Sequence, residues 1–142
     1  MSGEAIYRDA LMAHFRAPHH CGDLSGCERT ARVYNPLCGD ELEVGVSVTD
    51  GRIADARFRH RACSICVASA SMMTEAVTGL APDAVPELTQ ALHGWLEGED
   101  EARPRELPEG LDPLAAVRPV LARHRCVTLP WEGLAEALEP TA

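Results

Sequence analysis

The sequence contains no lysine, and all 13 of its basic residues are arginine. Enzymes that form a Schiff base use a lysine amine as nucleophile, and the common phosphate-binding loop places a lysine against the phosphates. Both kinds of chemistry are therefore excluded.

Long apolar runs are also missing. The longest ones, such as residues 65–68, are far shorter than the roughly 20 residues that a membrane-spanning helix needs. Residues 1–4 have neither the basic nor the apolar region of a secretory signal peptide. We therefore expect a cytoplasmic protein that does not act at a membrane.

A basic run interleaved with aromatic residues is absent, and the formal net charge is -9 at pH 7. This charge opposes binding to the phosphates of nucleic acid and favours a protein partner over DNA or RNA. With 142 residues and 46% hydrophobic composition, the chain is long enough for one core of its own. Internal repeats and coiled-coil heptads are lacking, so we expect one domain spanning residues 1–142.

The first half of the chain predicts one helix followed by a small sheet. Apolar residues recur at helical spacing over residues 4–16, and residues 29–34 are typical of a short strand. Residues 42–48 alternate between apolar and polar side chains, which predicts a strand with one buried face. Asp50-Gly51 is a strong signal for a two-residue hairpin turn that returns through residues 53–60.

The second half predicts helices. Residues 63–78 are almost all small or apolar and indicate a buried helix, and residues 83–98 carry an apolar face typical of another. We interpret an acidic connector at about 97–110 as an exposed loop, followed by a short helix over 112–119 and a last helix after Cys126. The expected fold is α+β, a small mostly antiparallel three-stranded sheet packed against about five helices.

Six cysteines in a chain without an export signal favour metal binding or thiol chemistry over disulfides, because cytosolic thiols are kept reduced. Cys38-Gly39-Asp40 puts a thiol and a carboxylate within three residues, with a glycine hinge between them. Cys63 and Cys126 fall at the ends of other predicted elements. These four side chains form a candidate tetrahedral zinc site, and the helix that begins at Cys63 favours its thiolate.

Some of the cysteines and histidines also fit different roles. Cys63 and Cys66 have the spacing of a redox dithiol, although that motif normally follows a parallel strand, whereas here it follows one arm of a hairpin. Cys66 also fits a small buried apolar residue. His19, His20 and Cys21 are close enough in sequence to suggest a second metal site.

The chain resembles the IscU/SufU/NifU N-terminal family of iron-sulfur assembly proteins over nearly its whole length. The motifs that carry this resemblance are Ile6-Tyr7, His14-Phe15-Arg16-Ala17-Pro18 with Gly22, Cys38-Gly39-Asp40, Ala54-Asp55-Ala56-Arg57-Phe58, Ala62-Cys63-Ser64-Ile65, Ala68-Ser69-Ala70-Ser71-Met72-Met73-Thr74 and Cys126-Val127-Thr128-Leu129-Pro130-Trp131.

Within this family the chain is similar to the SufU branch, because Arg125 precedes Cys126 and the segment 79–123 is long. The resemblance implies a zinc protein that accepts persulfide sulfur from a SufS-type cysteine desulfurase, activates that enzyme and passes sulfur on to downstream cluster-assembly proteins. The scaffold branch of the family instead implies assembly of a 2Fe–2S cluster on the same ligands.

Residue by residue, the resemblance makes Cys38, Asp40, Cys63 and Cys126 the ligands of the zinc ion or cluster, and Cys38 the catalytic sulfur acceptor. Arg125 is expected near the metal as a positive group that offsets the charge of the ligands.

Four further side chains have no role that the family pattern fixes. His124 is a candidate spare ligand or proton donor. Cys21 and Cys66 are additions to the family pattern, and Cys66 is a candidate alternative ligand or resolving thiol for a persulfide. Cys21 and Cys27 are expected to play no catalytic part.

Overall fold

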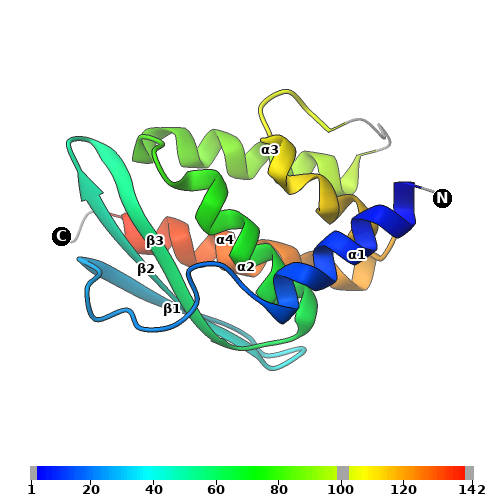
Figure 1. The fold of residues 1–142 in the computed structure, drawn as a ribbon, viewed down its shortest axis with the longest axis horizontal. Coiled ribbons are helices and arrows are strands. Elements are labelled where there is room, and N and C mark those ends of the chain that lie inside the picture. Colours follow the sequence, from blue (N-terminus) through cyan, green and yellow to red (C-terminus); the bar gives the residue numbers. More distant parts are fainter. Residues whose placement is uncertain (1–2, 99–102, 140–142) are drawn as a thin grey trace.

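The structure is a computed structural model, and it describes residues 3–98 and 103–139. Its elements in chain order are α1 (Gly3–Arg16), β1 (Arg29–Asn35), β2 (Asp40–Thr49), β3 (Arg52–Arg61), α2 (Ser64–Val77), η1 (Pro82–Ala84), α3 (Val85–Glu97), η2 (Glu109–Val117), η3 (Leu121–Arg123) and α4 (His124–Leu138), where η marks a 3-10 helix (Figure 1). With the nine-residue η2 counted as the fifth helix, the predicted α+β fold is confirmed.

The strands form one antiparallel sheet in the order β1-β2-β3. Asp50 and Gly51 connect β2 to β3 with positive φ angles of 53° and 74°, as the predicted two-residue turn requires. At the opposite end of the sheet, Asp40 pairs with Asn35 and Glu41 pairs with Arg61. The end of β3, which leads into α2, therefore lies beside the start of β2.

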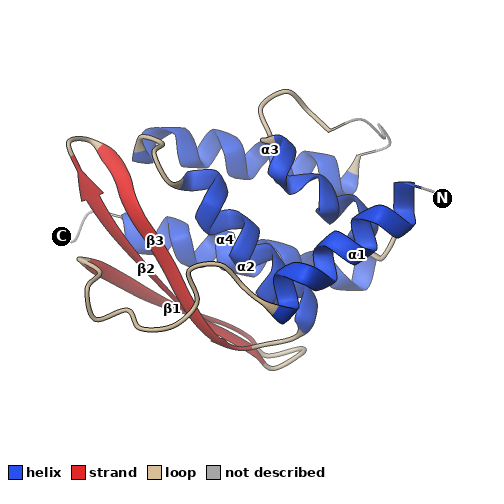
Figure 2. Cartoon of the chain, in the orientation of Figure 1, coloured by secondary structure: helices blue, strands red, loops and turns tan. Residues whose placement is uncertain are grey.

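Helices α2 and α4 cover one face of the sheet, and Figures 1 and 2 show the helices gathered on that side. Leu42, Val44 and Val46 of β2 are buried and face these helices, as the predicted alternation requires. The buried Ser69 of α2 donates a hydrogen bond to the Val127 carbonyl oxygen (2.6 Å) and accepts one from Trp131 Nε1 (3.2 Å). This polar network joins α2 to α4 inside the core.

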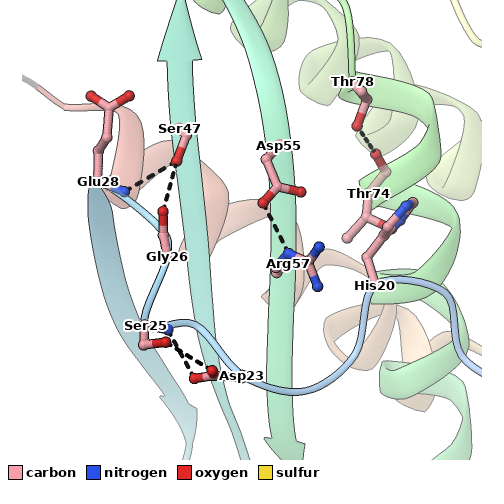
Figure 3. A network of polar contacts seen from close by, with 10 residues as sticks. All are labelled: His20, Asp23, Ser25, Gly26, Glu28, Ser47, Asp55, Arg57, Thr74 and Thr78. Atoms are coloured by element: carbon pink, nitrogen blue, oxygen red, sulfur yellow. Dashed lines mark hydrogen bonds and ion pairs between the residues drawn. The ribbon is translucent and has the colours of Figure 1, made fainter.

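The other face of the sheet is partly covered by the segment between α1 and β1, which crosses the strands in Figure 3. The Phe58 amide donates to the His20 carbonyl oxygen (3.1 Å), and the Glu28 amide donates to Ser47 Oγ (3.2 Å). A Cβ atom on Gly45 would lie 2.7 Å from Cys27 Sγ, so glycine is needed where this segment meets β2.

Helix α4 lies unusually close to the sheet at Gly133. A Cβ atom there would lie 2.8 Å from Val44 Cγ2 and 3.1 Å from Val33 Cγ2, closer than side chains pack. The absence of a side chain at Gly133 lets the helix rest on β1 and β2. This contact fixes the direction of α4 and hence the position of Cys126 in its first turn.

The C-terminal half differs from the sequence prediction in three places. Residues 99–102 of the expected connector lie outside the described residues, but Leu107 is buried and Arg103 forms an ion pair with Asp112 (2.5 Å), so this part packs against the domain. Helix η2 begins at Glu109 and not at 112, and α4 begins two residues before Cys126. No helix in the described ranges has the length and apolarity to cross a membrane.

Candidate metal centre

The ends of three elements meet at one point and bring three of the four predicted ligands together, with the fourth, Cys63, next to Asp40. Cys38 comes from the loop between β1 and β2, Asp40 from the first residue of β2, and Cys126 from the first turn of α4. The ligand atoms of these three residues lie within 4.8 Å of one another. Cys63, just before α2, has its Sγ 3.6 Å from Asp40 Oδ2.

The loop that carries Cys38 is held by the buried Asn35. Asn35 Oδ1 accepts a hydrogen bond from the Leu37 amide (3.1 Å), and the Asn35 carbonyl oxygen accepts one from the Gly39 amide (2.8 Å). Gly39 has a φ angle of 76°, in the left-handed region that favours glycine. The loop therefore holds Cys38 exposed, while Asp40 two residues later is buried.

Asp40 is at the centre of the site. Its Oδ2 accepts a hydrogen bond from Cys38 Sγ (3.0 Å), and its Oδ1 accepts one from the Cys63 amide (2.8 Å). Burial acts to raise the pKa of the Asp40 carboxyl, but the hydrogen bonds from Cys38, Cys63 and Cys126 outweigh it and hold the pKa below its usual value. The carboxylate is therefore ionised at neutral pH and able to bind a cation.

Cys63 is the N-cap residue of α2, as its predicted place at the start of a helix implied. Its Sγ accepts a hydrogen bond from the Cys66 amide (3.5 Å), and its backbone is extended. The start of α2 thus holds the Cys63 sulfur at the helix N-terminus, directly after β3.

Cys126 is buried in the first turn of α4, and burial raises the pKa of its thiol to about 12. Arg123 acts in the opposite direction, because its guanidinium Nη1 lies 3.9 Å from Cys126 Sγ and favours the thiolate. A thiol with so high a pKa keeps its proton at neutral pH unless a cation replaces that proton.

Among the described residues, Arg123 places its guanidinium beside a predicted ligand, whereas the sequence led us to expect Arg125 near the metal. The guanidinium of Arg125 instead forms an ion pair with Glu132 (2.8 Å). Because α4 begins at His124, a residue three positions before Cys126 lies on the same side of the turn, whereas the preceding residue points elsewhere. His124 Nε2 lies 2.8 Å from the Arg118 carbonyl oxygen, so its ring is engaged outside the ligand cluster.

Cys66 is fully buried one turn into α2 and packs with apolar residues, as expected for a small core side chain. Burial raises the pKa of its thiol, and the charges of Asp40, Cys63 and Cys126 raise it further. Its backbone amide contacts Cys63 Sγ and its side chain packs in the same apolar cluster as Cys126, so Cys66 lies directly behind the ligands. Cys21 and Cys27 lie on the segment before β1 and are half-buried.

The alternatives to a single centre receive less support. In the described ranges, the only group of at least three ligand atoms within metal-binding distance is that of Cys38, Asp40 and Cys126. His19 Nδ1 contacts Glu75, and His20 Nδ1 lies 3.0 Å from Thr74 Oγ1 (Figure 3), so these histidines do not converge with Cys21. Strand β3 is antiparallel to β2, which is the arrangement that disfavours a thioredoxin-like dithiol.

The donor atoms fit a metal centre. Three thiols and one carboxylate supply four ligands of the kind that zinc binds tetrahedrally, and thiolates also hold iron-sulfur clusters. Asp40 and Cys126 are buried, Cys63 is half-buried, and Cys38 is exposed. The site therefore combines buried ligands with one thiol that a partner can reach.

Comparisons with known proteins agree with this geometry. The profile of the NifU-like N terminal domain matches residues 6–93. The chain is 34% identical over 137 residues to the iron-sulfur cluster assembly scaffold protein IscU of Streptococcus pyogenes serotype M1, covering 96% of this chain and 85% of that protein. It is 29% identical over 131 residues to the zinc-dependent sulfurtransferase SufU of Bacillus subtilis, covering 92% and 88%.

Solved structures show the same fold. The N-terminal NifU-like protein of Brucella abortus matches with a TM-score of 0.79 at 25% identity, over 95% of this chain and 93% of the other. A putative iron-sulfur cluster assembly scaffold protein for the SUF system of Fervidobacterium islandicum AW-1 matches in fold with a TM-score of 0.81 at 23% identity, over 97% and 100%. The chain belongs to the family of NifU-like N-terminal domains.

Proposed function

We propose that this protein binds one zinc ion through Cys38, Asp40, Cys63 and Cys126 and accepts persulfide sulfur at Cys38 from a SufS-type cysteine desulfurase, for iron-sulfur cluster assembly. The observation that carries the proposal is the exposed Cys38 on a glycine-hinged loop in contact with buried ligands. A sulfur donor reaches this thiol without disturbing the core.

The transfer step balances without an external oxidant. The Cys38 thiolate attacks the outer sulfur of the donor persulfide, a new S–S bond forms on Cys38, and the donor cysteine leaves as a thiolate. Asp40 Oδ2, 3.0 Å from Cys38 Sγ, keeps the Cys38 side chain beside the other ligands. Bound zinc supplies a positive charge that keeps the ligand thiols deprotonated.

The zinc assignment is supported by the relative from Bacillus subtilis, which is named a zinc-dependent sulfurtransferase. The donor set supports it too, since thiolates with one carboxylate suit zinc. A cytoplasmic location and downstream acceptors in cluster assembly belong to the same proposal.

A second candidate is a scaffold that builds a 2Fe–2S cluster on the same four residues. The Streptococcus pyogenes relative favours it, because that protein is named a cluster assembly scaffold and is 34% identical to this chain. The two candidates share every ligand and differ in the metal that is bound.

The experiment that separates them is metal and sulfide analysis of protein purified without oxygen, followed by its addition to a SufS-type desulfurase with cysteine. One zinc per chain, no sulfide and a large rise in alanine formation support the sulfur acceptor. Iron and sulfide in equal amounts, with little stimulation, assign the scaffold function instead.

Cys38→Ala should abolish the stimulation, whereas Cys66→Ala should largely keep it. An equal loss in both variants would contradict Cys38 as the acceptor.

A further inference from the structure

The proposed function leaves Cys66 without a role, although this residue lies one helical turn from a predicted ligand. Cys63 is the N-cap residue of α2, and Cys66 is the third residue of that helix. The Cys66 amide nitrogen lies 3.5 Å from Cys63 Sγ, and Cys63 packs against the apolar cluster that contains Cys66. The two thiols therefore share one turn, with Cys63 at the metal centre and Cys66 in the core.

The spacing of these two cysteines suits a disulfide bond. Residues one helical turn apart are separated by about 5.4 Å, and disulfides join residues whose Cα atoms lie roughly 4.4–6.8 Å apart. Helical side chains lean toward the N-terminus of their helix, so a side chain at position 66 leans toward residue 63. Such a bond involves the start of α2 alone, and the antiparallel sheet that disfavours a thioredoxin-like enzyme does not affect it.

The two thiols differ in their exposure to solvent. Cys63 is half-buried, whereas Cys66 has no exposed surface. An oxidant from solvent therefore reaches Cys63 and does not reach Cys66. An oxidised thiol passes from sulfenic to irreversible sulfinic acid unless a second thiol converts the sulfenic acid to a disulfide. Cys66 is placed to be that second thiol.

We propose that Cys63 and Cys66 form a site of reversible oxidation, which a peroxide converts to a disulfide when no metal holds Cys63. Cys66 is the resolving thiol. The disulfide removes one predicted metal ligand until a thiol reductant restores it. The bond itself is independent of sulfur transfer, whereas its prevention by bound zinc rests on the proposed function.

The reaction balances with hydrogen peroxide as the oxidant. The Cys63 thiol takes one oxygen atom from the peroxide, which gives a sulfenic acid and one water. The Cys66 sulfur then attacks the Cys63 sulfur, so that an S–S bond forms and the S–O bond breaks. The hydroxide leaves with the Cys66 proton as a second water. The two sulfurs together lose two electrons, and the two peroxide oxygens gain them.

Other thiols of the centre offer a competing bond. The ligand atoms of Cys38 and Cys126 lie within 4.8 Å of one another, and Cys38 is exposed. A bond between these two joins the loop before β2 to α4, whereas a bond between Cys63 and Cys66 closes within one turn. The experiment therefore has to identify which cysteines are joined.

The test maps disulfides in protein that has been freed of metal with a chelator, treated with an equimolar amount of hydrogen peroxide and then alkylated. Trypsin cuts after arginine, and Cys63 and Cys66 lie on one peptide because the next arginine after Arg61 is Arg103. This peptide should be lighter by two hydrogen atoms and carry no alkyl group. The oxidised protein should bind zinc at least about tenfold more weakly, and dithiothreitol should restore the affinity.

Three variants sharpen the assignment. Cys66→Ala removes the resolving thiol, so excess peroxide should carry Cys63 to sulfinic acid without a disulfide on this peptide. Cys27→Ala is the matched control, because Cys27 is also buried in part but lies against Gly45 in the middle of β2, and it should form the disulfide as the native protein does. Cys38→Ala removes the exposed competing thiol and should form the disulfide as well.

The outcomes separate this inference from the proposed function. A disulfide that joins Cys38 to Cys126, or a Cys63 oxidised to sulfinic acid while Cys66 stays free, overturns the inference. In native protein loaded with zinc, the disulfide should form only as zinc is released, which a zinc-binding dye follows. Disulfide formation without zinc release supports the reactive pair and contradicts Cys63 as a ligand. A protein that binds no zinc but forms this disulfide overturns the proposed function and supports the inference.

Discussion

Two stretches of this chain place candidate metal-binding residues close together in sequence. In the folded protein, the side chains of one stretch converge with other candidate ligands, and those of the other do not. Cys38-Gly39-Asp40 meets Cys63 and Cys126 at one point. The adjacent His19 and His20 separate, since His19 contacts Glu75 and His20 contacts Thr74 on the side of α2.

The difference lies in where each stretch sits relative to the ends of elements. The ligands come from a hairpin loop and from the N-terminal turns of two helices, where backbone groups and side chains point toward a common space. The histidines instead run alongside α2, so each meets a different residue of that helix, as His14 does with Ser71 (2.7 Å). The candidate metal centre forms because its residues lie at the ends of elements that meet in space. Proximity in sequence alone does not bring such residues together.

The largest expected effect comes from removing the central ligand. Asp40→Ala should lose the zinc that we propose is bound, and its melting temperature should fall to that of the native protein treated with a chelator. Metal binding to cysteine-rich sites contributes on the order of 10 kcal/mol to folding, so this loss should exceed that caused by any substitution outside the ligand set. The readouts are zinc content and thermal unfolding.

The matched control is the double variant His19→Ala/His20→Ala, which should keep one zinc per chain and most of its stability, because surface contacts of this kind contribute less than about 1 kcal/mol each. Loss of zinc from the histidine variant, or no effect of a chelator on native unfolding, would contradict the contrast between the two stretches.

A smaller effect is expected from disturbing the framework without touching a ligand. Gly133→Ala forces a Cβ atom against Val44 and Val33 and should cost about 1–3 kcal/mol in unfolding free energy. Gly94→Ala on α3 is the control, because no atom lies within 4 Å of the added Cβ, and it should be neutral or stabilise the helix by up to about 1 kcal/mol. Equal stability of the two variants in denaturant unfolding would show that α4 does not rest on Gly133.

Much of the fold was predictable because its local signals agree with one another. The alternation in β2, the Asp50-Gly51 turn and the small apolar residues of α2 each specify an element on their own, and the structure confirms all three. The place of Cys63 at a helix start was also predictable, because the apolar run begins directly after it.

The position of the positive charge was not predictable from the residue types alone. Which arginine faces Cys126 depends on where α4 begins, and a shift of two residues at a helix start rotates the side chains by more than half a turn. The burial of Leu107 and the ion pair between Arg103 and Asp112 could not be predicted from the sequence either. The acidic, proline-containing segment around them has no periodic pattern that would indicate packing.

Substitutions of Cys66, directly behind the ligands, test whether this residue is itself a metal ligand. Cys66→Ala should keep one zinc per chain and cost about 1 kcal/mol, as the loss of a small buried side chain does. Cys66→Ser should cost about 1–3 kcal/mol, because a hydroxyl at this fully buried position needs a hydrogen-bond partner. If Cys66→Ala lost zinc, Cys66 would be a ligand and the cluster would extend into the core.

The smallest effect is expected in the histidine region, as a dependence of stability on pH. Burial, with the neighbouring charge of His19, lowers the pKa of His14 below its ordinary value of 6.5. The unfolded chain therefore takes up a proton more readily than the folded chain, so His14 makes stability fall as the pH drops through about 6.5. Because metal ligands also respond to acid, unfolding should be measured in a chelator between about pH 7.5 and 5.5. His14→Gln should flatten the curve there, although His60, whose pKa is also lowered by burial, should leave part of the slope. Identical slopes in the native protein and the variant would show that the contact between His14 and Ser71 does not depend on the charge of the ring.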